Sequence, residues 1–206
     1  MHRFRKLAVA LATAALAAGL TMAGTGTAHA AASPPAGPGT WAEIFAPEIN
    51  SNGITLCADN FGSTAQGHNL QLWRCHGYAS DGTPQRWNFS LAQQNRKDGT
   101  LFYQIENAGS GLCIGLDPNK VNISWSAIAG SNLVQESCVS NLTMWELVPA
   151  TLSPDPNNQF MLVNVYGPLT RIPYAMEANT FLDQNGNRLI AEPESFSNSA
   201  QWYALG

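Results

Sequence analysis

The chain has 206 residues, of which 12% are charged, and its formal net charge is −4. The segment 1–30 holds three of the ten basic residues and none of the fourteen acidic ones, so the remainder has 7 basic and 14 acidic residues, a net charge of −7. This remainder contains no cluster of Lys and Arg, which argues against nucleic acid or an anionic membrane surface as a partner.

The beginning of the chain is typical of an exported protein. A basic start precedes an apolar, Ala-rich stretch over 7–24, and Ala28-His29-Ala30 has the small-x-small pattern of a cleavage site. Residues 1–30 are therefore predicted to be a secretory signal peptide. Residues 31–40, rich in Pro and Gly, then form a linker. A retained membrane helix is the alternative, but no stop-transfer flank follows, so we expect a secreted protein without membrane insertion.

The sequence from residue 41 to residue 206 repeats itself three times. Trp87, Trp145 and Trp202 follow one another at spacings of 58 and 57. Three asparagines keep a similar period, with spacings of 57 and 57: Asn50, Asn107 and Asn164. A period shared by several residue types predicts three similar units in one domain. The expected units are about 41–97, 98–154 and 155–206.

Short β-strands are the expected local structure. Segments rich in aromatic and branched residues are separated by Gly, Asn, Pro and Ser, and no segment after the signal has a convincing helical period. The expected strand segments are 54–57, 70–73, 87–89, 102–105, 145–147 and 160–163. Units this small must share a core, so the sequence predicts an all-β domain. We expect Trp87, Trp145 and Trp202 each to contribute a ring to that core.

All four cysteines lie in the first two units, two in each. An exported protein can oxidise them, and of the three possible pairings the repeat favours the one that stays within each unit. The expected disulfides are Cys57–Cys75 and Cys113–Cys138. A zinc site is the competing interpretation, but the wide separations within these pairs, 18 and 25, provide no close cysteine pair, so no metal is expected.

The first unit resembles a known family in three motifs. They are Cys57-Ala58-Asp59, the stretch Gln71 to His76, and Gln85-Arg86-Trp87, and together they resemble one complete unit of the ricin B-type lectins, the β-trefoil carbohydrate-binding modules with Gln-x-Trp repeats. The resemblance covers nearly all of residues 42–206 and fades along the chain. It implies an all-β, β-trefoil fold with three repeats of about four strands and pseudo-threefold symmetry.

A sugar pocket needs a fixed carboxylate, a flat apolar ring and amides that orient the ligand. The two oxygens of Asp59 can accept neighbouring sugar hydroxyls. Trp73 alternates with Leu72, which is the better core residue, so the Trp73 ring is expected to cover the C–H face of the sugar. Turn capping by Asp59 and a supporting role for Gln85 are the alternatives. The candidate sugar-binding residues are Asp59, Gln71, Trp73, His76 and Gln85.

Several positions depart from the family pattern. Pro84 stands where the family usually has a sugar-binding Asn, so the first pocket has one amide fewer. In the second unit Gly115 replaces the anchoring Asp, and Glu136 stands at the aromatic position. In the third unit Glu177 takes the Asp position and Ala200 replaces the Gln. The second and third sites are therefore expected to be degenerate.

The expected function is that of a secreted, lectin-like protein that binds galactose-type or xylose-type glycans weakly through one pocket. Its expected partner is a glycan or polysaccharide, without a cofactor. Catalysis is not expected, because the chain lacks a Gly-x-Ser-x-Gly elbow and a phosphate loop, and nothing splits the pKa values of Glu192 and Glu194. The alternative is a protein-interaction module of the inhibitor or toxin-subunit type, which the eroded pockets and an insertion around Pro118 to Trp125 favour.

Overall fold

The computed structural model describes residues 41–46, 54–76, 83–95, 99–122, 125–149, 159–165, 173–179, 185–195 and 197–205. The predicted signal peptide, the linker and Asn50 lie outside the described residues. The described part consists mainly of short strands, which confirms the all-β prediction. A single turn of α-helix, α1 (Pro118–Val121), lies in the insertion of the second unit.

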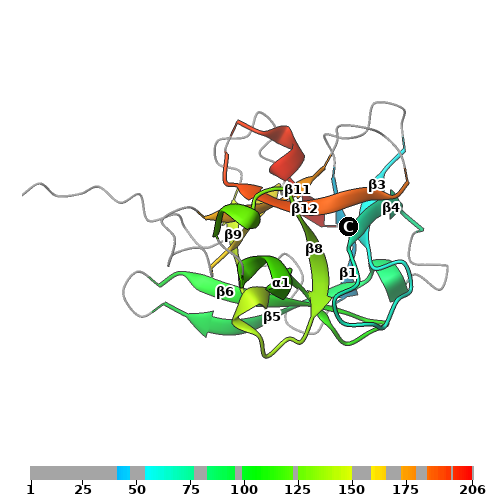
Figure 1. Ribbon diagram of the computed structural model, residues 1–206. Helices are drawn as coiled ribbons and strands as arrows, with labels where there is room; N and C mark the ends of the chain where they lie inside the picture. The colour runs from blue at the N-terminus through cyan, green and yellow to red at the C-terminus, as the bar shows by residue number, and fades with distance from the viewer. Residues whose placement is uncertain are drawn as a thin grey trace, which may run out of the picture.

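Seven strands form a closed barrel through antiparallel pairing. They are β1 (Trp41–Ala42), β2 (Ile44–Phe45), β5 (Trp87–Gln94), β6 (Leu101–Asn107), β9 (Trp145–Pro149), β10 (Phe160–Asn164) and β13 (Ala204–Leu205). The pairs run from β1 through β5, β6 and β9 to β10. A bridge between Phe160 and Tyr203, followed by pairing of β13 with β2, closes the ring, because β2 follows β1 after one residue. Figure 1 labels four strands of this ring, β1, β5, β6 and β9.

Three hairpins complete the fold. Their strands are β3 (Leu56–Asp59), β4 (Gln71–Arg74), β7 (Cys113–Leu116), β8 (Ser131–Glu136), β11 (Tyr174–Ala178) and β12 (Asn187–Pro193). The two strands of each hairpin pair with each other, and β12 also pairs with β4 and β8, so the hairpins hold one another together. Short 3-10 turns include η2 (Thr83–Gln85), η3 (Trp125–Ala127), η4 (Asn141–Thr143) and η6 (Ser199–Gln201).

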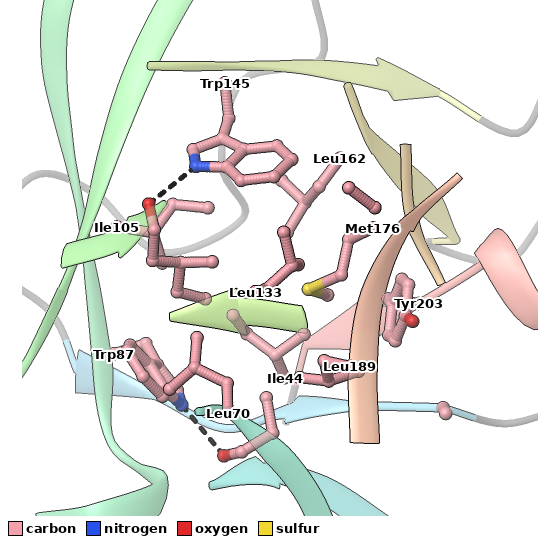
Figure 2. Packing of buried hydrophobic residues seen from close by; sticks show 14 of the residues in the cluster. Ile44, Leu70, Trp87, Ile105, Leu133, Trp145, Leu162, Met176, Leu189 and Tyr203 are labelled. Atoms are coloured by element: carbon pink, nitrogen blue, oxygen red, sulfur yellow. Dashed lines mark hydrogen bonds between the residues drawn. The ribbon is translucent and has the colours of Figure 1, made fainter. Parts of the chain in front are cut away.

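Two tryptophans occupy equivalent places in the main core. Trp87 and Trp145 are fully buried, and each indole N–H donates to a backbone oxygen in the first strand of a hairpin. The acceptors are Ala58 O at 2.9 Å for Trp87 and Ile114 O at 2.8 Å for Trp145. Figure 2 shows both rings facing a shared apolar cluster with Tyr203. Pairing a buried indole N–H in this way avoids the penalty of an unsatisfied donor.

The third core ring differs from the sequence prediction, because Tyr203 and not Trp202 enters the main core. Tyr203 is fully buried there, burial raises the pKa of its hydroxyl, and that hydroxyl donates to Ala200 O at 3.2 Å. Adjacent residues of an extended segment face opposite sides, so only one of the two rings can point into the barrel. Trp202 instead packs in a smaller cluster with Val148, Met161, Val163 and Ala175.

Each disulfide joins the first strand of a hairpin to the chain just after the second strand. Cys57 is bonded to Cys75 and Cys113 to Cys138, with Cα–Cα distances of 5.0 Å in each, so the predicted pairing is confirmed. Closing loops of this size stabilises a fold by about 3 kcal/mol each under the loop-entropy model. Within the described ranges, no helix has the length and apolar character needed to cross a membrane.

Candidate functional site

Asp59 is the last residue of β3, and both of its carboxylate oxygens are held by the surrounding chain. Its side chain is only 3% exposed. The backbone N–H of Phe61 donates to Oδ1, and the amide Nε2 of Gln85 donates to Oδ2 at 2.8 Å. A carboxylate has about four acceptor positions, so two remain for a ligand. Asp59 therefore caps its own turn and also has a fixed orientation suited to accepting hydroxyls.

Gln85 lies behind Asp59 and is fully buried. Besides its bond to Asp59, the amide donates to Arg74 O at 3.0 Å and accepts from the backbone N–H of His76 at 2.9 Å. Both ends of the amide are thus occupied by the protein. This geometry gives Gln85 the supporting role, because it positions the carboxylate and the end of β4 and has no exposed surface for a ligand.

A concavity of about 240 Å³ has Asp59 in its lining. Three of the candidate residues line it together with three neighbours: Asp59, Phe61, Gly62, Trp73, His76 and Pro84. Trp73 is half-buried, while Leu72 beside it is fully buried, as alternation along a strand requires. The structure therefore brings a fixed carboxylate, a half-buried indole and an exposed His76 side chain into one hollow.

Gln71 is a candidate residue that does not line the concavity. It lies opposite Asp59 in the β3–β4 register, and its Nε2 is buried without a hydrogen-bond partner. Gly186 lies in the turn before β12. A Cβ atom added to it would lie about 4 Å from both the Gln71 Oε1 and the Trp73 ring. Gln71 thus lies beside Trp73 on β4, outside the lining of the concavity.

Phe61 is a lining residue that the sequence prediction missed. Its ring is 63% exposed and meets Trp73 edge to face, with ring centroids 5.7 Å apart and an interplanar angle of 61°. The available signal was an isolated aromatic residue in the polar turn between Asn60 and Gly62. Pro84, which the sequence indicated as a missing amide, forms a further apolar wall.

The corresponding place in the second unit is filled by protein atoms. Glu136 lies opposite Cys113 as Trp73 lies opposite Cys57, and it is buried. A Cβ added to Gly115 would lie 2.9 Å from Thr143 Cγ2 and 3.2 Å from Glu136 Cβ. The second unit therefore has no carboxylate at the position of Asp59. The space that forms the concavity in the first unit is occupied here by Thr143 and Glu136.

The third unit keeps a carboxylate held by an amide, and that amide comes one residue later than the sequence prediction placed it. Gln201 Nε2 donates to Glu177 Oε2 at 2.9 Å and to Pro193 O at 2.9 Å, and Gln201 Oε1 accepts from the Ser195 backbone N–H at 2.7 Å. Gln85 makes the same three kinds of contact in the first unit. Gln201 therefore takes the role of Gln85, and the assignment of Ala200 to that position is wrong.

Glu192 stands in the third unit where Trp73 stands in the first, because it lies opposite Ala175 in the register. Burial, followed by the nearby Glu177 carboxylate, raises the pKa of Glu192 above its ordinary value of 4.5, and a backbone hydrogen bond from Gly130 opposes this. The sequence-based expectation that nothing near Glu192 would shift its pKa is therefore wrong. The third unit thus has a second carboxylate in place of an aromatic platform, which makes it unsuited to covering the C–H face of a sugar.

The raised pKa of Glu192 predicts a pH-dependent gain in stability for Glu192→Gln. A raised folded-state pKa gives a contribution to stability that is complete below the unfolded-state pKa and is lost as the pH rises through the folded value. The variant is therefore expected to have a higher urea midpoint than wild type at pH 7, with the difference shrinking toward zero below about pH 4. A difference of equal size at both pH values would contradict this origin.

The described residues gather three potential metal-binding side chains at one place, Glu43, Cys57 and Cys75. Both sulfurs of this group are bonded to each other in a disulfide. A thiolate is required for a cysteine to bind a metal, so the group supplies one carboxylate. The arrangement is therefore a buried acid packed beside a disulfide, which does not fit a metal centre.

The solved structures that resemble this chain include a designed protein, an agglutinin and part of an exo-β-1,3-galactanase. A designed threefold-symmetric protein, ThreeFoil, has a TM-score of 0.58 and 20% identity over 80% of this chain and 96% of its own. The agglutinin of Rhizoctonia solani has a TM-score of 0.52 and 18% identity over 84% of this chain and 98% of its own. An exo-β-1,3-galactanase of Clostridium thermocellum has a TM-score of 0.57 and 12% identity over 84% of this chain but only 31% of its own.

At these identities the likeness concerns the fold alone. The similar structures are β-trefoil proteins, and the all-β barrel described above resembles them in fold. No protein-family model matches the sequence, and no curated protein matches it either.

Proposed function

We propose that this chain is an exported β-trefoil protein of three related units that binds glycans through the concavity of its first unit and has no catalytic role. One observation carries the proposal: Asp59, whose nearly buried carboxylate is fixed through both oxygens, lines one hollow together with a half-buried tryptophan. The matching indole contacts of Trp87 and Trp145, and the matching amide contacts of Gln85 and Gln201, support the repeated units.

The chemistry of the concavity suits one sugar ring. The remaining acceptor positions of Asp59 can receive neighbouring hydroxyls, and charge-assisted hydrogen bonds of this kind are the strong ones. Trp73 presents an apolar face to C–H groups. A volume of about 240 Å³ lies below the roughly 300–1,000 Å³ of pockets that enclose drug-sized ligands. The site therefore fits a single sugar ring. The expected Kd is millimolar to high-micromolar, which corresponds to a binding free energy of about 4–6 kcal/mol.

Asp59→Ala and Trp73→Ala are each expected to abolish binding, because they remove the hydroxyl acceptor and the platform. Isothermal titration with galactose, lactose, xylan fragments and arabinan measures this, and the thermal unfolding midpoint shows that each variant is folded. Glu177→Ala is the matched control, since it removes the corresponding carboxylate of the third unit and should leave binding unchanged.

The absence of heat from the wild-type protein with every one of these sugars would contradict glycan binding. In that case a protein-interaction module becomes the better proposal, and pull-down of partners from spent culture medium tests it. Loss of binding in Glu177→Ala would contradict the assignment of the site to the first unit.

A further inference from the structure

Phe61 combines two unfavourable features in one residue. Its φ is +56°, and it is the only residue other than glycine with a positive φ in the described part of the chain. For a bulky side chain this conformation is strained. Its ring is also 63% exposed. Neither feature is needed to turn the chain, because a glycine or an asparagine adopts the same φ without an exposed ring.

The turn that carries Phe61 is fixed by several hydrogen bonds. Asp59 Oδ1 accepts from the Phe61 backbone N–H, and Asn60 Oδ1 accepts from the Gly62 N–H at 2.9 Å. The Asn60 N–H donates to Pro84 O at 3.1 Å. Strained conformations persist only where the surroundings determine them in this way, and they concentrate at ligand sites.

A buried polar network anchors the same turn to the second unit. Asn60 Nδ2 donates to Asn107 Oδ1 at 2.9 Å and to Gln135 Oε1 at 3.0 Å. Gln135 Nε2 donates in turn to Ser63 O at 2.9 Å. Asn60, Asn107 and Gln135 are all buried. Contacts between two units thus hold an exposed aromatic ring at the edge of the concavity.

The rings of Phe61 and Trp73 make a corner and not a flat platform. They meet edge to face at 61°, and Pro84 lines the same hollow. Apart from the Trp73 indole N–H, the lining side chains that can hydrogen-bond are those of Asp59 and His76. A sugar held by the Asp59 carboxylate therefore places part of its surface against three apolar walls.

Resting on the glycan-binding function proposed above, we infer that Phe61 contacts the ligand, and that the corner of Phe61, Trp73 and Pro84 selects a 6-deoxyhexose. A hydroxymethyl group placed against these walls would lose hydrogen bonds to water without replacement. A methyl group in the same place gains from burial. The site therefore distinguishes sugars by the substituent on C5, in addition to their ring hydroxyls.

Matched sugar pairs test this selection. D-fucose and D-galactose share the configuration of every ring hydroxyl and differ only by methyl against hydroxymethyl, and L-arabinose is the corresponding pentose with hydrogen there. L-rhamnose with L-mannose, and L-fucose with L-galactose, extend the comparison to other ring configurations. The 6-deoxy member of the binding series is expected to bind about tenfold or more tightly than its partners, as measured by isothermal titration.

Phe61→Asn isolates the contribution of the ring, because asparagine tolerates a positive φ and the turn should persist. It is expected to reduce the preference for the 6-deoxy sugar to about twofold or less, with the thermal unfolding midpoint kept. Leu91→Asn is the matched control, since Leu91 is 58% exposed and does not line the concavity. It should retain the full preference.

Two outcomes separate this inference from the proposed function. If sugars bind but the hydroxymethyl members bind as tightly as the 6-deoxy members, or if Phe61→Asn keeps the preference, the inference is wrong and glycan binding stands. If the wild-type protein binds no sugar of any series, both are wrong.

Discussion

Replacing Trp145 by alanine is expected to lower the free energy of unfolding by about 3–5 kcal/mol, because a fully buried ring leaves the shared core. The ring projects from β9, which is hydrogen-bonded to β6 on one side and β10 on the other. These strands cannot close over the space without breaking their ladder, so most of the cavity should remain. Urea unfolding, with the m-value compared between proteins, measures the loss.

The indole N–H of Trp145 contributes separately from its volume. It donates to Ile114 O at 2.8 Å in β7. Trp145→Phe keeps an apolar ring but removes this donor, so a smaller loss of about 1–3 kcal/mol is expected. Val139→Ala is the surface control, since Val139 is 92% exposed, and it should change stability by less than about 0.5 kcal/mol. Equal losses in the core and surface variants would contradict the placement of Trp145.

The spacing between repeats places the third unit more accurately than matching residue types does. Trp145 follows Trp87 at a spacing of 58, and Tyr203 follows Trp145 at the same spacing. Gln201 likewise follows Gln85 at twice that spacing. Trp202 lies one residue before the position that this spacing gives, so matching the tryptophans shifts the third unit by one residue. In the extended segment at Trp202 and Tyr203, a one-residue shift moves the side chains to the other face, so the wrong ring is assigned to the main core. In the 3-10 turn η6 the same shift assigns Ala200, in place of Gln201, to the position of Gln85.

The disulfides and the alternation of Leu72 with Trp73 could be predicted, because each follows from spacing within one unit or one strand. The position of Phe61 could not, because its turn is fixed by Asn60 contacts to side chains far along the chain, in the second unit. The closed second site was recognisable from residue types, but only the fold shows that Glu136 and Thr143 occupy the space beside Gly115. Local patterns thus predicted local geometry, while the shape of the candidate site depends on contacts between units.

Gln85→Leu is expected to remove most of the binding and to destabilise the fold. Leucine cannot donate to Asp59 Oδ2, so a carboxylate that is only 3% exposed loses a charge-assisted hydrogen bond. The expected loss is about 1.5–3 kcal/mol for that contact, before the contacts to Arg74 O and the His76 N–H are counted. Without this partner the carboxylate can rotate, so sugar affinity should fall by about tenfold or more, measured by isothermal titration on the folded variant.

Gln201→Leu is the control that separates support of the fold from support of the site. Gln201 makes the same contacts to Glu177, Pro193 and Ser195 that Gln85 makes in the first unit. Its loss should therefore lower the unfolding free energy by a similar amount of about 1.5–3 kcal/mol. Sugar affinity should stay within about twofold of wild type, because the third unit has Glu192 where the first has Trp73. If Gln201→Leu removed binding while Gln85→Leu retained it, the working pocket would belong to the third unit, since in each unit the amide acts only through the carboxylate that it holds.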